Sequence, residues 1–348
     1  MQDLQKPMIL AITDGRPGHE TQTQGICIIL NRDQKYLVEY IKIKTISKFK
    51  KKILMWGFKF FSKSWMLGQI FDLDEFEDMD IDSIEYIVSA GGDTLLANAL
   101  LKVYLSSVDV PAKNIIATSL RGMPASAFDA VFTIDENKAG RSPFIYYPIA
   151  PNKLLSFNLD KDEQGARQKL NLKSGTGVWS VLIGADSHDV SIGSVEDWII
   201  MLENLAQNFS ADEFFISTSR RTPKLFEQAL KNVLKQYKNV HLILVGEGDK
   251  TPVKDLMYAA NIIICSPDST SMVSESLMLQ KPVLIAHFAG TRLNSEFEKY
   301  YADKKNRGWI KFYSPEHFDI QILNDFKYEY HAIKLEELIK AQFESNNL

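Results

Sequence analysis

The sequence predicts an α/β protein with two domains, and three observations carry that prediction. Short apolar runs typical of buried parallel strands alternate along the chain with segments of helical periodicity. The alternation breaks once and then restarts, and 348 residues suffice for two domains with separate cores. Two successive strand–helix series indicate two α/β domains.

The first series of expected strands covers residues 8–13, 85–90, 115–119 and 130–134. The second covers residues 179–185, 213–219, 241–247, 261–266 and 282–287. Helical periodicity separates the strands, for example from Val195 and from Thr222, where the next residue is a proline suited to a first helical turn. Two prolines and a polar stretch break the rhythm near residue 155. We therefore expect an N-terminal domain over 1–155, a second domain over 156–330 and a closing helix over 331–348.

Composition narrows the class of function. A formal net charge of −4 and a pI near 5.9 argue against a general nucleic-acid-binding protein, which normally carries a basic excess. Cys27 and Cys265 both lie in apolar segments, which favours buried, reduced thiols over a disulfide framework. No signal peptide is visible, and no segment approaches the roughly 18 to 20 apolar residues that span a bilayer. The expected compartment is therefore the cytoplasm.

The loops after the strands are the places to search for a site, because ligands of open parallel sheets collect beyond the carboxyl ends of the strands. The first such loop begins at Asp14 and has glycines at Gly15 and Gly18, which permit close approach of a ligand. His19 and Glu20 follow, just before a helix expected to start near Thr21. A catalytic loop and an ordinary turn with a helix cap both remain open.

A second loop of the first series reads SAGGDT. Gly91 and Gly92 suit close approach of a ligand to the backbone, and Asp93 follows them after a strand. Asp93 is a candidate for orienting an acceptor, and a helix N-cap is the alternative.

The second series contains a denser cluster of polar residues. Two adjacent arginines flanked by hydroxyls follow one strand and precede a helix, an arrangement that favours an anion site over a solvated basic turn: Ser217, Ser219, Arg220 and Arg221. Further along, small and hydroxyl residues follow two more strands and open a helix, namely Gly246, Ser269, Thr270, Ser271 and Ser274. Glu275, one turn into that helix, is placed to accept hydrogen bonds from ribose hydroxyls. The alternative is an acid that only favours the helix dipole.

Residues 46–71 form a basic and aromatic segment with six lysines and no acid. Such a segment suits an anionic membrane surface, where each lysine contributes about 1 kcal/mol. The residues expected to touch it are Lys50, Lys51, Lys52, Trp56, Phe60 and Trp65. A buried helix whose lysines extend to water is the alternative.

Four motifs together, ITDGRPGHETQTQG, SAGGDT, STSRRTP and PDSTSMVSE, resemble the mitochondrial-fission ELM family. The last motif, extended to SPDSTSMVSESLMLQKPVLI, is also similar to the donor-nucleotide motif of GT-B glycosyltransferases such as the lipid-linked N-acetylglucosaminyltransferase of peptidoglycan synthesis. The resemblance spans residues 8–290. It implies a GT-B fold, with two Rossmann-like domains facing across a cleft. The plant member of the family is known for mitochondrial fission, whereas the bacterial relatives look like sugar transferases.

The resemblance also implies roles for residues. Glu275 would bind the donor ribose, the backbone of Ser269 to Ser271 would lie beside the phosphates, and Arg220 and Arg221 would bind the diphosphate. His19 matches the histidine that ends the first glycine loop of the lipid-linked transferase, where a base for the acceptor hydroxyl is expected. This chain has DGRPGH in place of that enzyme's full run of glycines.

These observations favour a metal-independent, cofactor-free glycosyltransferase. It would move a sugar from a nucleotide sugar to an envelope glycolipid or polysaccharide at the inner face of the plasma membrane. The alternative is a non-catalytic GT-B-shaped scaffold that recruits a membrane-fission partner. An NAD enzyme is disfavoured because no GxGxxG opens either series, and no metal-binding motif is apparent.

Overall fold

The computed structural model describes residues 6–58, 63–76, 79–155, 159–314, 323, 325–328 and 331–345. The chain divides into two compact units. Unit 1 comprises residues 1–155 together with 331–348, and unit 2 comprises residues 156–330. Each unit has its own parallel sheet, which confirms the α/β class.

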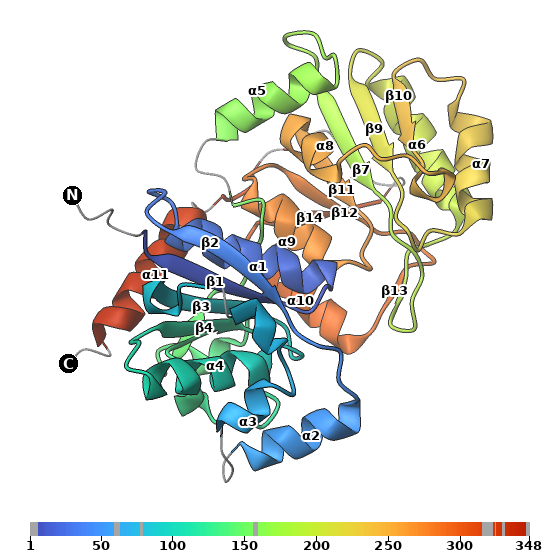
Figure 1. Cartoon of the computed structure of the whole chain (residues 1–348). Helices are drawn as coiled ribbons and strands as arrows, with labels where there is room; N and C mark the ends of the chain where they lie inside the picture. The colour runs from blue at the N-terminus through green and yellow to red at the C-terminus, as the bar shows by residue number, and fades with distance from the viewer. Residues whose placement is uncertain are drawn as a thin grey trace. The chain divides into compact units, whose positions relative to one another are not determined.

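The sheet of unit 1 has six parallel strands in the order β2-β1-β3-β4-β5-β6. They are β1 (Met8–Thr13), β2 (Leu37–Lys42), β3 (Ile84–Ala90), β4 (Lys113–Ala117), β5 (Ala130–Thr133) and β6 (Phe144–Tyr146). The helices are α1 (Pro17–Leu30), α2 (Lys48–Gly57), α3 (Lys63–Leu67), α4 (Leu95–Ser107) and α11 (His331–Ser345). Figure 1 shows α1 and α4 on opposite faces of this sheet.

The core of unit 1 follows the two-residue period of its central strand. Met8, Leu10 and Ile12 join a cluster with residues of α2, α3 and α4. Ile9 and Ala11, which alternate with them, are equally buried and point to the other face, where α1 lies. Cys27, on α1, is buried, and this burial raises the pKa of its thiol to about 12.

The sheet of unit 2 has six parallel strands in the order β10-β9-β7-β11-β12-β14. They are β7 (Val178–Leu182), β9 (Glu213–Ser217), β10 (Val240–Ile243), β11 (Ile262–Cys265), β12 (Val283–Ala286) and β14 (Ile310–Tyr313), and β8 (Val190–Ser191) pairs separately with β13 (Arg292–Leu293). The helices are α5 (Leu159–Lys169), α6 (Val195–Asn208), α7 (Lys224–Leu234), α8 (Val253–Ala259), α9 (Thr270–Met278) and α10 (Ser295–Asn306).

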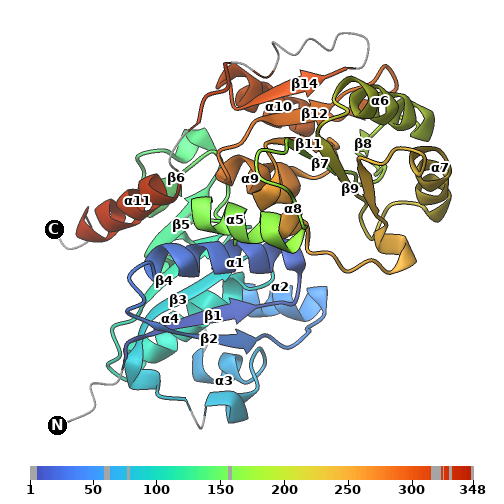
Figure 2. The ribbon, with the colours of Figure 1, turned by 90° about the horizontal axis from the view of Figure 1, so that it is seen from above.

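Two helix pairs cover the faces of this second sheet. Trp179 and Val181 of β7 pack into a cluster with residues of α6 and α7, which lie side by side (Figure 2). Val178, which alternates with them, packs with Leu256 of α8 and with Leu170 and Leu172, just after α5. Cys265 is fully buried at the end of β11, and burial raises its pKa to about 12. Both thiols are therefore buried and unpaired, as expected.

Some element boundaries differ from the expectation. Helix α1 begins at Pro17 rather than near Thr21, because proline at N1 already has the helical φ and lacks the N–H that the first turn leaves unpaired. The strand expected over 241–247 ends at Ile243, and Val245–Glu247 forms a 3-10 turn instead. Strands β2, β6 and β14 were not anticipated. No described helix is long and apolar enough to cross a membrane.

Candidate functional site

The strand order of each unit reverses direction once, and the candidate residues gather at those two reversals. In unit 1 the chain leaves β1 for β2 on one side and continues with β3 on the other. In unit 2 it runs from β7 outward to β10 and then returns to β11, beside β7. A sheet of this type opens a crevice at such a switch point, beyond the carboxyl ends of the two neighbouring strands. The loops after β1, β3, β7 and β11 are therefore the first places to inspect.

In unit 1 the loop after β1 pairs His19 with Asp14. The Nδ1 atom of His19 lies 2.6 Å from Oδ2 of Asp14, whose side chain is only 4% exposed. The contact suits the tautomer of neutral histidine in which Nδ1 donates to the carboxylate and Nε2 keeps its lone pair. Gly91 makes room for the ring, because a Cβ there would collide with His19. Sequence reasoning placed Asp14 in the loop but did not recognise it as the partner of His19.

Glu20, the other candidate base of this loop, is already engaged. The Thr13 hydroxyl donates to its Oε1 at 2.8 Å. Gly15, with a φ of +76°, supplies the left-handed turn that brings the chain from β1 to α1. Gly18 lies inside α1 rather than in the loop, since the helix begins one residue earlier. Of the two candidate bases, His19 has the geometry of an oriented one.

Asp93 is not the N-cap of α4, so that alternative is wrong. The N-cap is Thr94, whereas Asp93 accepts from Lys51 Nζ at 2.6 Å and from Arg16 Nη2 at 2.8 Å. The Lys51 ammonium also donates to the carbonyl oxygen of Gly92. The hydrogen bond from Lys51, with the charges of Arg16 and Arg121, holds the pKa of Asp93 below its ordinary value. Asp93 is thus an ionised anchor for basic side chains.

These basic side chains line an open pocket of about 700 Å³ in unit 1. Its walls include Arg16, Lys51, Lys52, Trp56 and Arg121. Arg121 lies directly over Gly92, where a Cβ would collide with its guanidinium. Arg121 has no counterpart among the residues expected from the sequence, because a single arginine in a turn carries no pattern.

The basic and aromatic segment is neither wholly buried nor wholly exposed. Leu54 and Phe58 pack into the core, while Trp56 and Trp65 are 65% and 62% exposed. Lys50 and Lys52 are exposed, but Lys51 turns inward to Asp93 and cannot contact a surface as expected. Phe60 lies outside the described residues.

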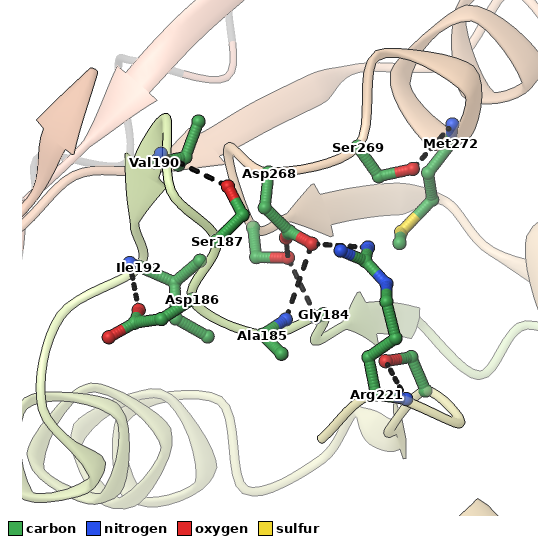
Figure 3. Close-up of polar contacts among 12 residues, drawn as sticks. Gly184, Ala185, Asp186, Ser187, Val190, Ile192, Arg221, Asp268, Ser269 and Met272 are labelled. Carbon is green, nitrogen blue, oxygen red and sulfur yellow. Dashed lines mark hydrogen bonds and ion pairs between the residues drawn. The ribbon is translucent and has the colours of Figure 1, made fainter. Parts of the chain in front are cut away.

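In unit 2 the buried carboxylate of Asp268 joins three strand ends (Figure 3). Its Oδ1 accepts from the Ser266 hydroxyl at 2.6 Å. Its Oδ2 accepts from the Ala185 N–H, after β7, at 3.2 Å and from Arg221 Nη2, after β9, at 2.6 Å. Gly184 must lack a side chain here, because a Cβ would collide with Asp268. Sequence reasoning missed Asp268, although a lone carboxylate in the serine-rich loop SPDSTS was the available signal.

The two arginines of unit 2 differ in how they are held. Asp268 fixes the Arg221 guanidinium at the switch point, and 53% of that side chain remains exposed. Arg220 is exposed and forms no hydrogen bond or ion pair with the described part of the chain. The Ser219 hydroxyl accepts from the Arg221 N–H at 3.2 Å and so stabilises the loop. Arg221 is therefore the arginine with a defined position.

Three residues expected to bind the donor are instead engaged in the fold. The Ser217 hydroxyl is buried and donates to the Thr218 carbonyl. Gly246 donates its N–H to Oε1 of the buried Glu227, which leaves no room for a side chain at Gly246. The Ser274 hydroxyl is buried against the Tyr300 hydroxyl at 3.0 Å. All three therefore have a structural role, and their contact with a donor stays a prediction.

The remaining donor candidates lie at the start of α9. Ser269 caps this helix by accepting from the Met272 N–H at 3.3 Å (Figure 3). Thr270 and Ser271 form its first turn, where unpaired N–H groups and the helix dipole favour an anion. Glu275 is half-buried and lies beyond the first turn of α9. Because the dipole favours an acid mainly within the first turn, the dipole alone does not explain Glu275. In the described residues, no three His, Cys, Asp or Glu side chains gather as metal ligands would.

Comparison with known proteins assigns the family. A model of the family described as Mitochondrial fission ELM1 matches residues 17–334. The chain belongs to this family. This ELM1-family protein is 28% identical over 172 residues to an uncharacterized Rickettsia prowazekii protein, RP120, and the match covers 48% of this chain and 47% of that one. The chain thus spans about half the length of this curated relative.

Solved structures establish the fold. A UDP-GlcNAc 2-epimerase from Methanocaldococcus jannaschii matches with a TM-score of 0.56 and 14% identity, covering 97% of this chain and all of that one. The Neisseria meningitidis UDP-GlcNAc 2-epimerase, solved bound to UDP-GlcNAc, matches with a TM-score of 0.53, 14% identity and the same coverage of 97% and 100%. The ELM1-family chain therefore has the glycosyltransferase-like GT-B fold.

Proposed function

We propose that this protein is a glycosyltransferase that moves a sugar from a nucleotide sugar to a hydroxyl of an envelope glycolipid or polysaccharide. The observation that carries the proposal is the His19–Asp14 pair at the switch point of unit 1. A base for an acceptor hydroxyl must present a lone pair in one orientation, and the contact with Asp14 holds the His19 ring in place and favours the tautomer that has its lone pair on Nε2.

The donor side of the proposal rests on unit 2. Arg221, held by Asp268, and the N–H groups at the start of α9 present positive charge where a diphosphate would bind. A crystallised protein of the same fold binds UDP-GlcNAc, which makes uridine nucleotides the first to test. Glu275 is proposed to hold the ribose.

The proposed reaction is a displacement at the anomeric carbon of the sugar. The acceptor oxygen forms the new bond to that carbon while its proton passes to Nε2 of His19. The bond between the anomeric carbon and the diphosphate oxygen breaks, and the electron pair leaves with the nucleoside diphosphate. Arg221 and the α9 N–H groups stabilise the developing charge, so this chain's own groups do the work that a metal ion does elsewhere.

The protein is also proposed to work at the inner face of the plasma membrane. Support comes from α2, where Phe49, Ile53 and Trp56 are 75%, 50% and 65% exposed beside the exposed Lys50 and Lys52. An apolar stripe flanked by lysines is typical of helices that lie in a membrane interface.

The deciding experiment measures thermal unfolding against UDP, GDP, CMP, dTDP, ADP and NAD. A ligand at about 100 times its dissociation constant stabilises by about 2.7 kcal/mol, enough for a shift of several degrees. We expect one nucleotide to give this shift and Glu275→Ala to lose it. Transfer from the matching nucleotide sugar is then assayed with His19→Gln as the inactive control.

The alternative is a scaffold that recruits a fission partner, in line with the name of the family. It predicts no shift with any nucleotide and no effect of Glu275→Ala. A selective shift would exclude a protein that only keeps the shape of the fold, because such a scaffold has no need of a nucleotide site.

A further inference from the structure

The 700 Å³ pocket of unit 1 is positively charged, although the protein as a whole is acidic. Arg16, Lys51, Lys52 and Arg121 line it with a single carboxylate, Asp93, a net charge of +3. Since the whole chain carries −4, this excess of positive charge is local. A pocket of this kind attracts an anion with more than one negative charge.

Two of the four cations have no direct polar partner among the described residues. Lys51 and Arg16 are paired with Asp93, but Lys52 and Arg121 form no hydrogen bond or ion pair with another described residue, and both are exposed. Arg121 also has a left-handed backbone, with a φ of +46°, a conformation that costs free energy in a non-glycine residue. This backbone is followed by Gly122 and brings the guanidinium over Gly92, toward the pocket.

The rest of the pocket wall is apolar. Met55, Trp56 and Met123 lie next to the basic groups, and Gly122 and Pro124 complete the wall. On α2, Phe49, Ile53 and Trp56 follow at spacings of four and three residues and therefore share one side of the helix. Trp56 belongs to both the stripe and the pocket, so the exposed apolar stripe is continuous with the wall of the basic pocket.

We infer that this pocket binds the phosphate of a membrane amphiphile, with Lys52 and Arg121 as its ligands and Trp56 against its apolar chain. The phosphate would match the positive charge of the pocket. The alkyl chain of the amphiphile would lie against the apolar wall and the apolar stripe that leads to it. Naming this amphiphile as the sugar acceptor rests on the proposed function, whereas the binding itself does not. The acceptor class is then a phosphate-bearing lipid rather than a neutral polysaccharide.

Dodecyl phosphate below its micelle concentration is the probe, measured by calorimetry on the full chain without nucleotide. Lys52→Gln and Arg121→Gln each remove one charge-assisted contact, so each should weaken binding about tenfold. Lys35→Gln is the matched control, because it removes the same charge from an exposed lysine of the same unit outside the pocket and should leave the affinity unchanged. Inorganic phosphate and dodecyl maltoside should bind far more weakly than dodecyl phosphate. Thermal unfolding of each variant checks that the fold is intact.

Each contrary outcome overturns the inference in a recognisable way. Equal affinity for inorganic phosphate would mean a site for soluble anions, and equal affinity for dodecyl maltoside would mean a purely apolar site. A loss of affinity in Lys35→Gln as large as in Lys52→Gln would mean attraction by general charge. If the wild-type protein binds a nucleotide but not dodecyl phosphate, only this inference is overturned. If it binds dodecyl phosphate but no nucleotide, only the proposed function is overturned.

Discussion

Arg221 and Asp268 lie 47 residues apart in the chain and meet at 2.6 Å, one half-exposed and the other with a fully buried side chain. The buried carboxylate fixes a guanidinium that faces solvent at the switch point of unit 2. Burying a carboxylate costs free energy unless it is paired, and the pairing here leaves much of the cation accessible. This relationship distinguishes the two adjacent arginines that the sequence presents as equals.

Arg221→Gln should weaken nucleoside diphosphate binding about tenfold or more, because a hydrogen bond to a charged group contributes about 1.5–3 kcal/mol. Arg220→Gln is the matched control and should have a smaller effect, since nothing in the described structure holds Arg220 in place. Calorimetric titration with the nucleotide that stabilises the protein measures both. A larger loss in Arg220→Gln would reverse the assignment.

Asp268→Asn should lower the free energy of unfolding by about 1–3 kcal/mol, because the amide cannot satisfy the Ala185 N–H, the Ser266 hydroxyl and Arg221 together. It should also weaken nucleotide binding through the displaced Arg221. The double variant Asp268→Asn with Arg221→Gln should therefore bind the nucleotide only slightly more weakly than Arg221→Gln alone.

Urea unfolding and nucleotide titration of the two single variants and the double variant test this coupling. The exposed Asp249→Asn serves as a control for stability. Fully additive losses of affinity would show that Asp268 does not act through Arg221.

His19→Gln should lower the rate of sugar transfer by about 10²–10⁴-fold while leaving nucleotide affinity unchanged, because only the base is lost. Asp14→Asn should also lower the rate, since an asparagine amide can donate to Nδ1 and favour the tautomer with its proton on Nε2. The comparison is with Glu20→Gln. This substitution should change the rate little, because Thr13 already binds the carboxylate of Glu20. Steady-state rates of the three variants decide between His19 and Glu20 as the base.

Stability in acid should depend on Asp93. Its pKa lies below the ordinary value of 3.8, chiefly because of the hydrogen bond from Lys51. The folded state therefore holds the proton less tightly than the unfolded chain, so the stabilisation is fully present above the ordinary pKa. It is lost as the pH falls from that value through the lower pKa of the folded state.

The free energy of urea unfolding, measured through this acid range, tests the effect. Asp93→Asn should flatten the pH dependence, and Lys51→Met should flatten it as well by removing the main cause of the shift. Identical slopes for the wild-type protein and Asp93→Asn would contradict the assignment.

Much of the fold could be predicted because apolar runs and helical periodicity are local signals. Central strands such as β1 and β7 are buried on both faces and therefore apolar throughout. The missed strands of the two six-stranded sheets lie at the sheet edges. Strand β2 is exposed at several positions and mixes apolar with charged residues, and β6 is three residues long, so neither carries that signal.

The sequence by itself determined the α/β class, the two strand–helix series and the loops in which candidate residues lie, because these depend on chain order and residue type. The tertiary structure alone decided which of those residues meet. Strand order brings the loop after β11 beside the loop after β7, and this placed Asp268 against Ala185 and Arg221. Side-chain direction turned Lys51 inward to Asp93 and Ser217 into the fold. Contacts between residues distant in the chain depend on strand pairing and packing, which no local pattern contains.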